Sequence, residues 1–194
     1  MADEFRFLSA SPLAARMRPK SVGDVVGQEK VLGPGSALRR LVEATAPVAN
    51  LIASASGLTF KELSAVNAGV KDVREVIEQA KVDSQLYSKQ TVLFIDEIHR
   101  FSRTQQDALL PAVEAGWLTM IAATTENPSF SVIDPLLSRS LLITLDSLDD
   151  EAIDAVLTKA LDDERGFAGQ ATLTDEARKG IIARANGDLR RALT

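Results

Sequence analysis

The sequence lacks several residue types on which whole classes of protein depend. It has no cysteine and a single histidine, His99, which excludes disulfide frameworks and thiol nucleophiles and almost excludes zinc sites. One tryptophan and one tyrosine give no aromatic platform for stacking nucleobases. No run of about 18 apolar residues could cross a membrane, and the acidic start MADEF is unlike a secretory signal. We therefore expect a cytoplasmic protein that does not associate with membranes.

The distribution of charge suggests where one domain ends. The 22 basic and 27 acidic residues give a net charge of −5, so no overall positive field attracts the chain to nucleic acid. Acidic residues strongly outnumber basic ones between Asp146 and Glu176. Because this shift follows the last strand-like segment, we place a boundary near Ser147 and predict two domains, residues 1–146 and 147–194.

Short apolar segments alternate with helical patterns in the first domain. The 194 residues, of which 45% are hydrophobic, suffice for one full domain and a small appendage. Residues 60–66, 91–96, 119–125 and 141–145 are rich in apolar or β-branched residues, which predicts strands. The continuous apolar run at 92–95 indicates a strand covered on both faces. We predict an α/β fold, a parallel sheet with helices on both faces.

The second domain has a helical period throughout. An apolar stripe runs from Ile153 to Leu161, Thr174 has the position of an N-cap, and Asn186-Gly187 is typical of a helix end. Asp188 is then placed to cap one more helix, which the end of the sequence cuts short. We predict a small, incomplete helical domain.

Two adjacent acids follow the most apolar strand. Ligands of a parallel sheet bind beyond the carboxyl ends of its strands, and Asp96 and Glu97 directly follow the run at 92–95. Nucleotide hydrolases use such a pair, because Mg²⁺ needs a carboxylate on rigid backbone and the attacking water needs a second one beside it. The alternative is that Asp96 only caps the next helix.

Two further positions could contribute to phosphoryl chemistry. Thr124 and Thr125 end the next predicted strand, where a hydroxyl could orient a water or contact a terminal phosphate. Arg139 precedes the predicted strand at 141–145 and could reach a nucleotide on a neighbouring subunit. The alternatives are a polar turn closed by Pro128 and a solvated loop charge.

Other catalytic classes lack their signatures. No G-x-S-x-G or G-x-G-x-x-G pattern occurs. These absences argue against a serine hydrolase and against a dinucleotide-binding fold. Residues 96–99 spell DEIH, the pattern of a helicase box. A helicase of that class needs two lobes, for which this chain is too short.

Several longer strings together resemble one family. The strings ELSAVNAGVKDVREVI (62–77), DEIHRF (96–101), ATTENPSF (123–130), LLSRS (136–140) and NGDLRRALT (186–194) closely resemble AAA+ ATPases of the replication-associated recombination protein A family. The resemblance covers nearly the whole chain. It implies a clamp-loader-like, DNA-stimulated ATPase of replication-fork maintenance, recombination and repair. It also implies ATP and Mg²⁺ as cofactors, a homo-oligomer, and as partners DNA ends, junctions and forks and the single-strand-binding protein.

The resemblance also implies roles for individual residues. The Walker B magnesium ligand would be Asp96, the catalytic base Glu97, sensor 1 Thr125 with Thr124 as the alternative, the arginine finger Arg139, and the lid's sensor 2 residue Arg190. The adenine would be held, mostly by backbone and apolar contacts, by the segment that contains Arg18, Pro19, Val25, Val26, Gly27 and Gln28.

One element of the family is missing. A phosphate-binding loop, G-x-x-x-x-G-K-[ST], should precede the segment at 62–77, yet the sequence has no Gly-Lys pair. A strand and its loop, about fifteen residues by ordinary lengths, are absent at Ala49/Asn50. Either the sequence joins residues across a segment that it does not include, or the protein truly lacks the loop. We favour the first, since loss of a central strand would leave two rows of buried backbone groups unpaired. If the second holds, the alternative function is a nucleotide-free, clamp-loader-like binding module.

Overall fold

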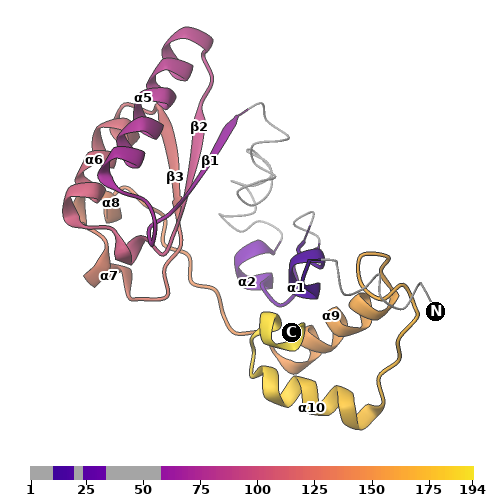
Figure 1. The fold of residues 1–194 in the computed structure, drawn as a ribbon. Coiled ribbons are helices and arrows are strands. Elements are labelled where there is room, and N and C mark those ends of the chain that lie inside the picture. The colour runs from indigo at the N-terminus through magenta and orange to yellow at the C-terminus, as the bar shows by residue number, and fades with distance from the viewer. Residues whose placement is uncertain (1–10, 20–23, 34–57) are drawn as a thin grey trace. The chain divides into compact units, whose positions relative to one another are not determined.

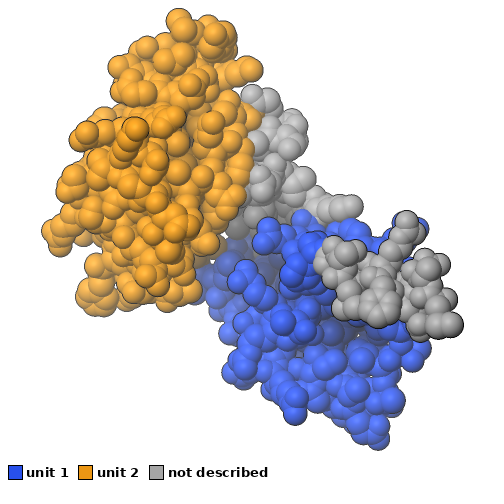
Figure 2. Space-filling model, in the orientation of Figure 1, with its two compact units in different colours: residues 1–36, 144–194 blue, residues 37–143 orange. Residues whose placement is uncertain are grey.

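The computed structural model describes residues 11–19, 24–33 and 58–194 (Figure 1). The chain divides into two compact units (Figure 2). Residues 37–143 form the sheet unit, and residues 1–36 together with 144–194 form the helical unit. The helical unit thus combines both ends of the chain, whereas the domains predicted at 1–146 and 147–194 stay a prediction. The predicted junction at 49/50 lies outside the described residues.

The sheet unit is built on three parallel strands. They are β1 (Thr59–Ser64), β2 (Thr91–Asp96) and β3 (Leu118–Ala122), in the order β1-β2-β3. The register sets Leu63 opposite Ile95, and Ile95 opposite Ala122. The most apolar segment of the sequence is therefore the central strand, as its burial requires. The predicted α/β fold with a parallel sheet is confirmed.

Two long helices cover the face of the sheet that carries Leu93 and Ile95. Helix α5 (Val70–Tyr87) and helix α6 (Arg103–Glu114) contribute Val73 and Leu109 to the same buried cluster as these strand residues. All four side chains are 0% exposed. Burial of such side chains stabilises a domain by about 2 kcal/mol each, so the sheet is anchored directly below the strand ends.

A buried amide holds the loop that follows β3. This loop contains α7 (Pro128–Ser131) and α8 (Asp134–Leu137). Gln106 of α6, 2% exposed, donates from Nε2 to the carbonyl oxygens of Phe101 (3.2 Å) and Ser131 (2.9 Å). Its Oε1 accepts from the backbone N–H of Ile133 at 2.9 Å. The loop is thereby tied to α6 at the junction between α7 and α8.

The predicted strand at 141–145 is wrong. Residues 141–145 have no strand conformation, and Leu141, Leu142 and Leu145 are 60%, 62% and 66% exposed. A strand forms only where a neighbour pairs with its backbone groups. In the described part of the chain, β3 pairs with β2 alone and no strand lies beside 141–145. The composition of this segment is that of a strand, but its partner is missing.

The helical unit has its own apolar core. It comprises α1 (Leu13–Arg16), α2 (Glu29–Leu32), α9 (Asp150–Asp162), α10 (Asp175–Ala185) and α11 (Leu189–Ala192). Met17 packs with Ile153, Leu157 and Ala185 in one buried cluster, so the N-terminal segment shares the core of the C-terminal helices.

The helix ends of this unit agree with the sequence. The hydroxyl of Thr174 accepts from the N–H of Ala177 at 3.2 Å, and Asn186 ends α10 in the left-handed conformation with φ 49°. Asp188 caps α11 by accepting from the N–H groups of Arg190 and Arg191. The predicted caps are confirmed.

Candidate functional site

The two acids stand at the carboxyl end of β2 on backbone that both neighbouring strands hold. The carbonyl oxygen of Asp96 accepts from the N–H of Ala65, just past β1, at 3.0 Å. On the other side, the N–H of Ala123 donates to Ile95 (2.9 Å), and its carbonyl accepts from Ile98 (3.0 Å). The chain thus leaves the ladder only at residues 96 and 97. Their side chains stand on rigid backbone at the edge where parallel sheets bind ligands.

The two carboxylates differ in surroundings. Asp96 is exposed, and its side chain makes no hydrogen bond or ion pair with the described residues. Glu97 is half-buried and pairs through Oε2 with Nε of Arg100 at 2.9 Å. The N-cap position of the short helix η3 (Ile98–Arg100) belongs to Glu97, and no side chain caps this helix. The alternative that Asp96 serves as a helix cap is therefore wrong.

Glu97 adopts a strained conformation. Its φ of 54° and ψ of 47° lie in the left-handed region, which costs a residue with a Cβ about 1–2 kcal/mol. Such strain persists where surrounding structure enforces it, and it is concentrated at functional sites. Here the bonds of Ile95 and Ile98 to Ala123 enforce it. The conformation turns the chain sharply directly after Asp96.

The two threonines behind β3 are not equivalent. Oγ1 of Thr124 lies 3.0 Å from Nδ1 of His99 and accepts from the N–H of Glu126 at 3.0 Å. Thr125 is exposed, and its hydroxyl bonds to none of the described residues. Sequence reasoning did not find the contact of His99, because its partner is 25 residues away. Thr125 is the hydroxyl that is available to a ligand, and its role as sensor 1 stays a prediction.

Arg139 is held within the sheet unit. Its guanidinium pairs with Oε1 of Glu114, at the end of α6, at 2.8 Å, and donates to the carbonyl of Pro135 at 2.9 Å. No contact joins it to Asp96, Glu97 or Thr125 in the described structure. The side chain is 46% exposed, as an arginine that acts on another subunit would need to be.

The helical unit contains a cavity at the predicted adenine segment. Its volume is about 520 Å³, and it is bordered by Met17, Leu148 and Val156 among apolar residues. Of the predicted nucleotide-binding residues, it is lined by Pro19, Val25, Val26, Gln28 and Arg190. Arg18 is not among the lining residues, but its carbonyl accepts from the lining residue Arg165 at 3.2 Å. The two predicted sets of residues, the strand-end set and this one, belong to different units.

Gly27 is needed where this segment crosses the start of α9. Its φ is +71°, and a Cβ there would lie 2.6 Å from Cδ2 of Leu148 and 3.1 Å from Cβ of Ala152. The neighbouring Gln28 donates from Nε2 to the carbonyl of Asp146 at 2.8 Å. The backbone of the predicted adenine segment therefore packs closely against residues 146–152.

Three cations line the cavity, and two of them are neutralised. Lys159 pairs with Asp24 at 2.6 Å, and Arg165 pairs with Asp163 at 2.7 Å. Arg190 is exposed, and no described carboxylate pairs with it. Its backbone is fixed, because its N–H donates to the capping side chain of Asp188 at 2.8 Å. Arg190 is thus the cation of this cavity that an anionic ligand can engage.

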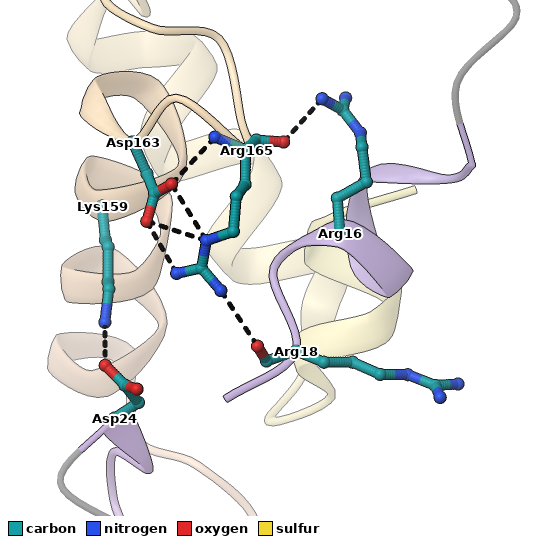
Figure 3. A network of polar contacts seen from close by, with 6 residues as sticks. All are labelled: Arg16, Arg18, Asp24, Lys159, Asp163 and Arg165. Atoms are coloured by element: carbon teal, nitrogen blue, oxygen red, sulfur yellow. Dashed lines mark hydrogen bonds and ion pairs between the residues drawn. The ribbon is translucent and has the colours of Figure 1, made fainter. Parts of the chain in front are cut away.

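The Arg165–Asp163 pair belongs to a polar network (Figure 3). Asp163 also accepts from the N–H of Arg165 at 2.8 Å. These hydrogen bonds from Arg165 lower the pKa of Asp163 from 3.8 to about 2, and the carboxylate in turn raises the pKa of Arg165. The bonds of Arg165 to Arg16 and Arg18 could not be predicted from the sequence, since these partners lie 149 and 147 residues away from it.

Metal binding in this structure has to rely on few protein groups. In the described ranges, no group of three or more His, Cys, Asp or Glu side chains is placed to hold a metal ion. Mg²⁺ in phosphoryl-transfer sites typically takes one or two carboxylates and completes its shell with phosphate oxygens and water. A single exposed carboxylate on rigid backbone, such as Asp96, fits that mode.

None of the helices in the described ranges has the length and apolar character that a membrane span requires.

Comparisons with known proteins agree on one family. The model of the "ATPase family associated with various cellular activities (AAA)" matches residues 43–145. An AAA domain-containing protein of Mycobacterium tuberculosis is 50% identical, over 96% of this chain and 44% of that protein. Replication-associated recombination protein A of Escherichia coli is 43% identical, over 94% of this chain and 44% of its own length. ATPase WRNIP1 of Dictyostelium discoideum is 36% identical, over 97% of this chain and 23% of its own length.

The alignments bear on the missing segment. The chain spans less than half the length of the first two relatives. The alignment with the M. tuberculosis protein runs over 201 positions but includes 96% of 194 residues, about 186. About 15 positions of that relative, the difference between 201 and 186, therefore have no counterpart here. This number is close to the roughly fifteen residues of one strand and a phosphate-binding loop.

Proposed function

The chain belongs to the AAA family of ATPases, and from that premise we propose that it is the ATPase part of a protein that acts on DNA in replication and recombination. The observation that carries the proposal is the pair Asp96 and Glu97 at the carboxyl end of the central strand. The names of the relatives support the process, since proteins called replication-associated recombination protein A are 32–43% identical to this chain.

The strand-end residues fit distinct roles in hydrolysis of ATP. Asp96 would hold Mg²⁺, which when bound neutralises phosphate charge as it develops. Glu97 would orient the attacking water and accept its proton, and its distance from Asp96 is fixed by the turn at φ 54°. Thr125 would contact the terminal phosphate. These groups stand on backbone that does not need to rearrange, which is the condition for electrostatic catalysis.

Two arginines would act on the phosphates from elsewhere. Arg190 has no carboxylate partner among the described residues and lines the cavity of the adenine segment, so we assign it to the nucleotide of its own chain. Arg139 would leave Glu114 and reach the nucleotide of a neighbouring subunit in a homo-oligomer. An arginine supplied in this way accelerates phosphoryl transfer by about 10³–10⁵.

The sequence lacks the loop that binds phosphates in this family. No Gly-Lys pair is present, so the backbone amides and lysine that hold phosphates in this family have no counterpart. We propose that hydrolysis requires the 15 or so residues that the M. tuberculosis relative has in addition. We further propose DNA ends, junctions and forks as the substrate, the single-strand-binding protein as a partner and the cytoplasm as the location.

An insertion experiment tests the proposal. ATP hydrolysis is measured with and without forked DNA on the chain as it stands and on a chain with the relative's extra residues inserted between Ala49 and Asn50. We expect activity only after insertion, stimulated by DNA and abolished by Glu97→Gln. Activity that survives Glu97→Gln undiminished would show that this carboxylate is not the base.

A second function is favoured by the missing loop itself. If the protein works without those residues, it is a nucleotide-free, clamp-loader-like binding module. Equilibrium dialysis with ATP at millimolar concentration, on the chain with and without the inserted residues, separates the two functions, because such a module binds no ATP in either form, with or without Mg²⁺. DNA or partner binding that ATP affects in neither form of the chain would establish the second function and remove the first.

A further inference from the structure

Two walls of the cavity in the helical unit come from opposite ends of the chain. Pro19 and Asp24 belong to the N-terminal wall, and Lys159 and Arg165 to the wall formed by α9 and the turn after it. The shape of the cavity therefore depends on how firmly residues 16–19 and 24–28 are attached to residues 159–166. Apolar contact at Met17 is one attachment. The network in Figure 3 is the other.

Two arginines exchange hydrogen bonds between these walls. Arg16 donates from one guanidinium nitrogen to the carbonyls of Arg165 (2.6 Å) and Gly166 (3.0 Å). Arg165 donates in the opposite direction, to the carbonyl of Arg18 at 3.2 Å (Figure 3). We call these three bonds the arginine clasp. Each guanidinium binds backbone, so the clasp fixes the path of the main chain and not only the position of side chains.

The turn that carries Arg165 is itself rigid. Asp163 accepts from the backbone N–H and from both Nε and one terminal nitrogen of Arg165. Close packing adds to this, because a Cβ at Gly166 would collide with the carbonyl oxygen of Ala160. Because this turn is rigid, the guanidinium of Arg165 has a fixed position and can hold the carbonyl of Arg18 in place.

All three guanidinium nitrogens of Arg165 are engaged within the protein. Nε and one terminal nitrogen bind Asp163, and the other terminal nitrogen binds the carbonyl of Arg18. The charge is neutralised by the carboxylate. Three of the five N–H donors of Arg165 are thus used inside the protein and its charge is paired, so its main effect on a ligand passes through Arg18 and the residue after it, Pro19.

We propose that Arg165 is a positioning residue of the nucleotide pocket, which holds the Arg18–Pro19 backbone against α9 through the arginine clasp and so sets the width of the base-binding cavity. The inference rests on the proposed function, since that function assigns the cavity to adenine nucleotide. Its structural half, that Arg165 orders residues 16–19, does not depend on what the cavity binds.

The test compares two arginine–aspartate pairs of the same unit. Arg178 pairs with Asp154 at 2.6 Å and is 24% exposed, close to the 23% of Arg165, but it does not line the cavity. Arg165→Ala and Arg178→Ala are made in the full chain. For each, we measure amide hydrogen exchange at residues 15–18, the thermal midpoint and the dissociation constant for ADP.

In Arg165→Ala we expect exchange at residues 17 and 18 to speed up and the dissociation constant for ADP to rise about tenfold, as loss of a hydrogen bond from a charged donor predicts. Arg165→Ala and Arg178→Ala should lower the thermal midpoint by similar amounts. Arg178→Ala should change neither the exchange at residues 17 and 18 nor the dissociation constant for ADP. Arg165→Lys should not restore binding, because one ammonium cannot serve Asp163 and the Arg18 carbonyl in the geometry of the guanidinium.

Three outcomes overturn the inference. The first is unchanged exchange at residues 15–18 in Arg165→Ala, and the second is unchanged ADP affinity in that variant. The third is an equal loss of ADP affinity in Arg178→Ala, which would reduce Arg165 to a general stabiliser. If the unsubstituted chain binds no ADP, the affinities are measured in the chain with the residues inserted between Ala49 and Asn50. Absence of ADP binding there as well makes the proposed function fail, and the exchange measurement alone then decides whether the clasp orders the N-terminal wall.

Discussion

The two units hold their candidate residues in different ways. In the sheet unit, main-chain hydrogen bonds to Ala65 and Ala123 fix the backbone at Asp96 and Glu97, and of the two side chains only Glu97 has a described partner, Arg100. In the helical unit, the position of the backbone itself depends on side chains, chiefly Arg16 and Arg165. A strand-end site should therefore tolerate side-chain changes without losing its shape. The cavity of the helical unit should lose its shape when one charged side chain is removed.

The largest expected effect comes from the scaffold below the strand-end site. Leu93 is 0% exposed in the centre of β2, so Leu93→Ala should lower the free energy of unfolding of the sheet unit by about 3 kcal/mol. Hydrogen exchange in β2 and in α9 measures the two units separately. Equal losses in both would contradict the comparison, because they would mean that the units unfold as one.

A close contact in the helical unit comes next. Gly27→Ala should destabilise that unit by about 2 kcal/mol, because the new methyl group collides with Leu148 and the backbone is left-handed. Gly116→Ala is the matched control, since it has φ +69° with nothing within 4 Å of the added Cβ. The control should lose only about 1 kcal/mol. Equal losses in urea unfolding would show that the contact at Gly27 relaxes without cost.

The strained residue of the site gives a smaller effect of opposite sign. Glu97→Gly should stabilise the sheet unit by less than about 1 kcal/mol, since relief of strain is partly offset by loss of the ion pair with Arg100. Ser88→Gly, at φ 52° and outside the site, should give the full gain. Urea midpoints of both variants measure the difference. Destabilisation by Glu97→Gly would mean that the left-handed turn depends on its side chain.

The smallest expected effect is the loss of stability at low pH, where Asp163 becomes protonated. The pKa of Asp163 is lowered from 3.8 to about 2 by Arg165, so this pair stabilises the folded state fully above pH 3.8 and loses that contribution as the pH falls toward 2. An NMR titration of the Asp163 carboxyl carbon should show the low pKa, and Arg165→Ala should return it toward 3.8. An unchanged pKa in that variant would assign the shift to another cause.

The sequence predicted elements whose signal is local. Strand β2 was predicted at its observed bounds because four apolar residues in a row can only be buried, and α10 was predicted from a threonine cap and an Asn-Gly end. The error at 141–145 has the opposite origin, since a strand needs a neighbour and the leucines there describe only its composition.

The candidate site divides in the same way. Asp96 and Glu97 could be predicted, because they directly follow a recognisable strand. The clasp could not, since Arg16 and Arg165 meet across 149 residues and neither differs in sequence from a solvated arginine. The contact of His99 with Thr124 was missed for the same reason, although it distinguishes the two threonines.

The buried amide of Gln106 constrains which sequences can share this site's architecture. It donates twice and accepts once within the described protein, and neither a carboxylate, which cannot donate, nor an apolar side chain of equal length can do both. Substitution there would free the loop behind the threonines while leaving every proposed catalytic group chemically intact. A variant at this position would therefore keep all proposed catalytic residues and still displace the segment that leads to Arg139.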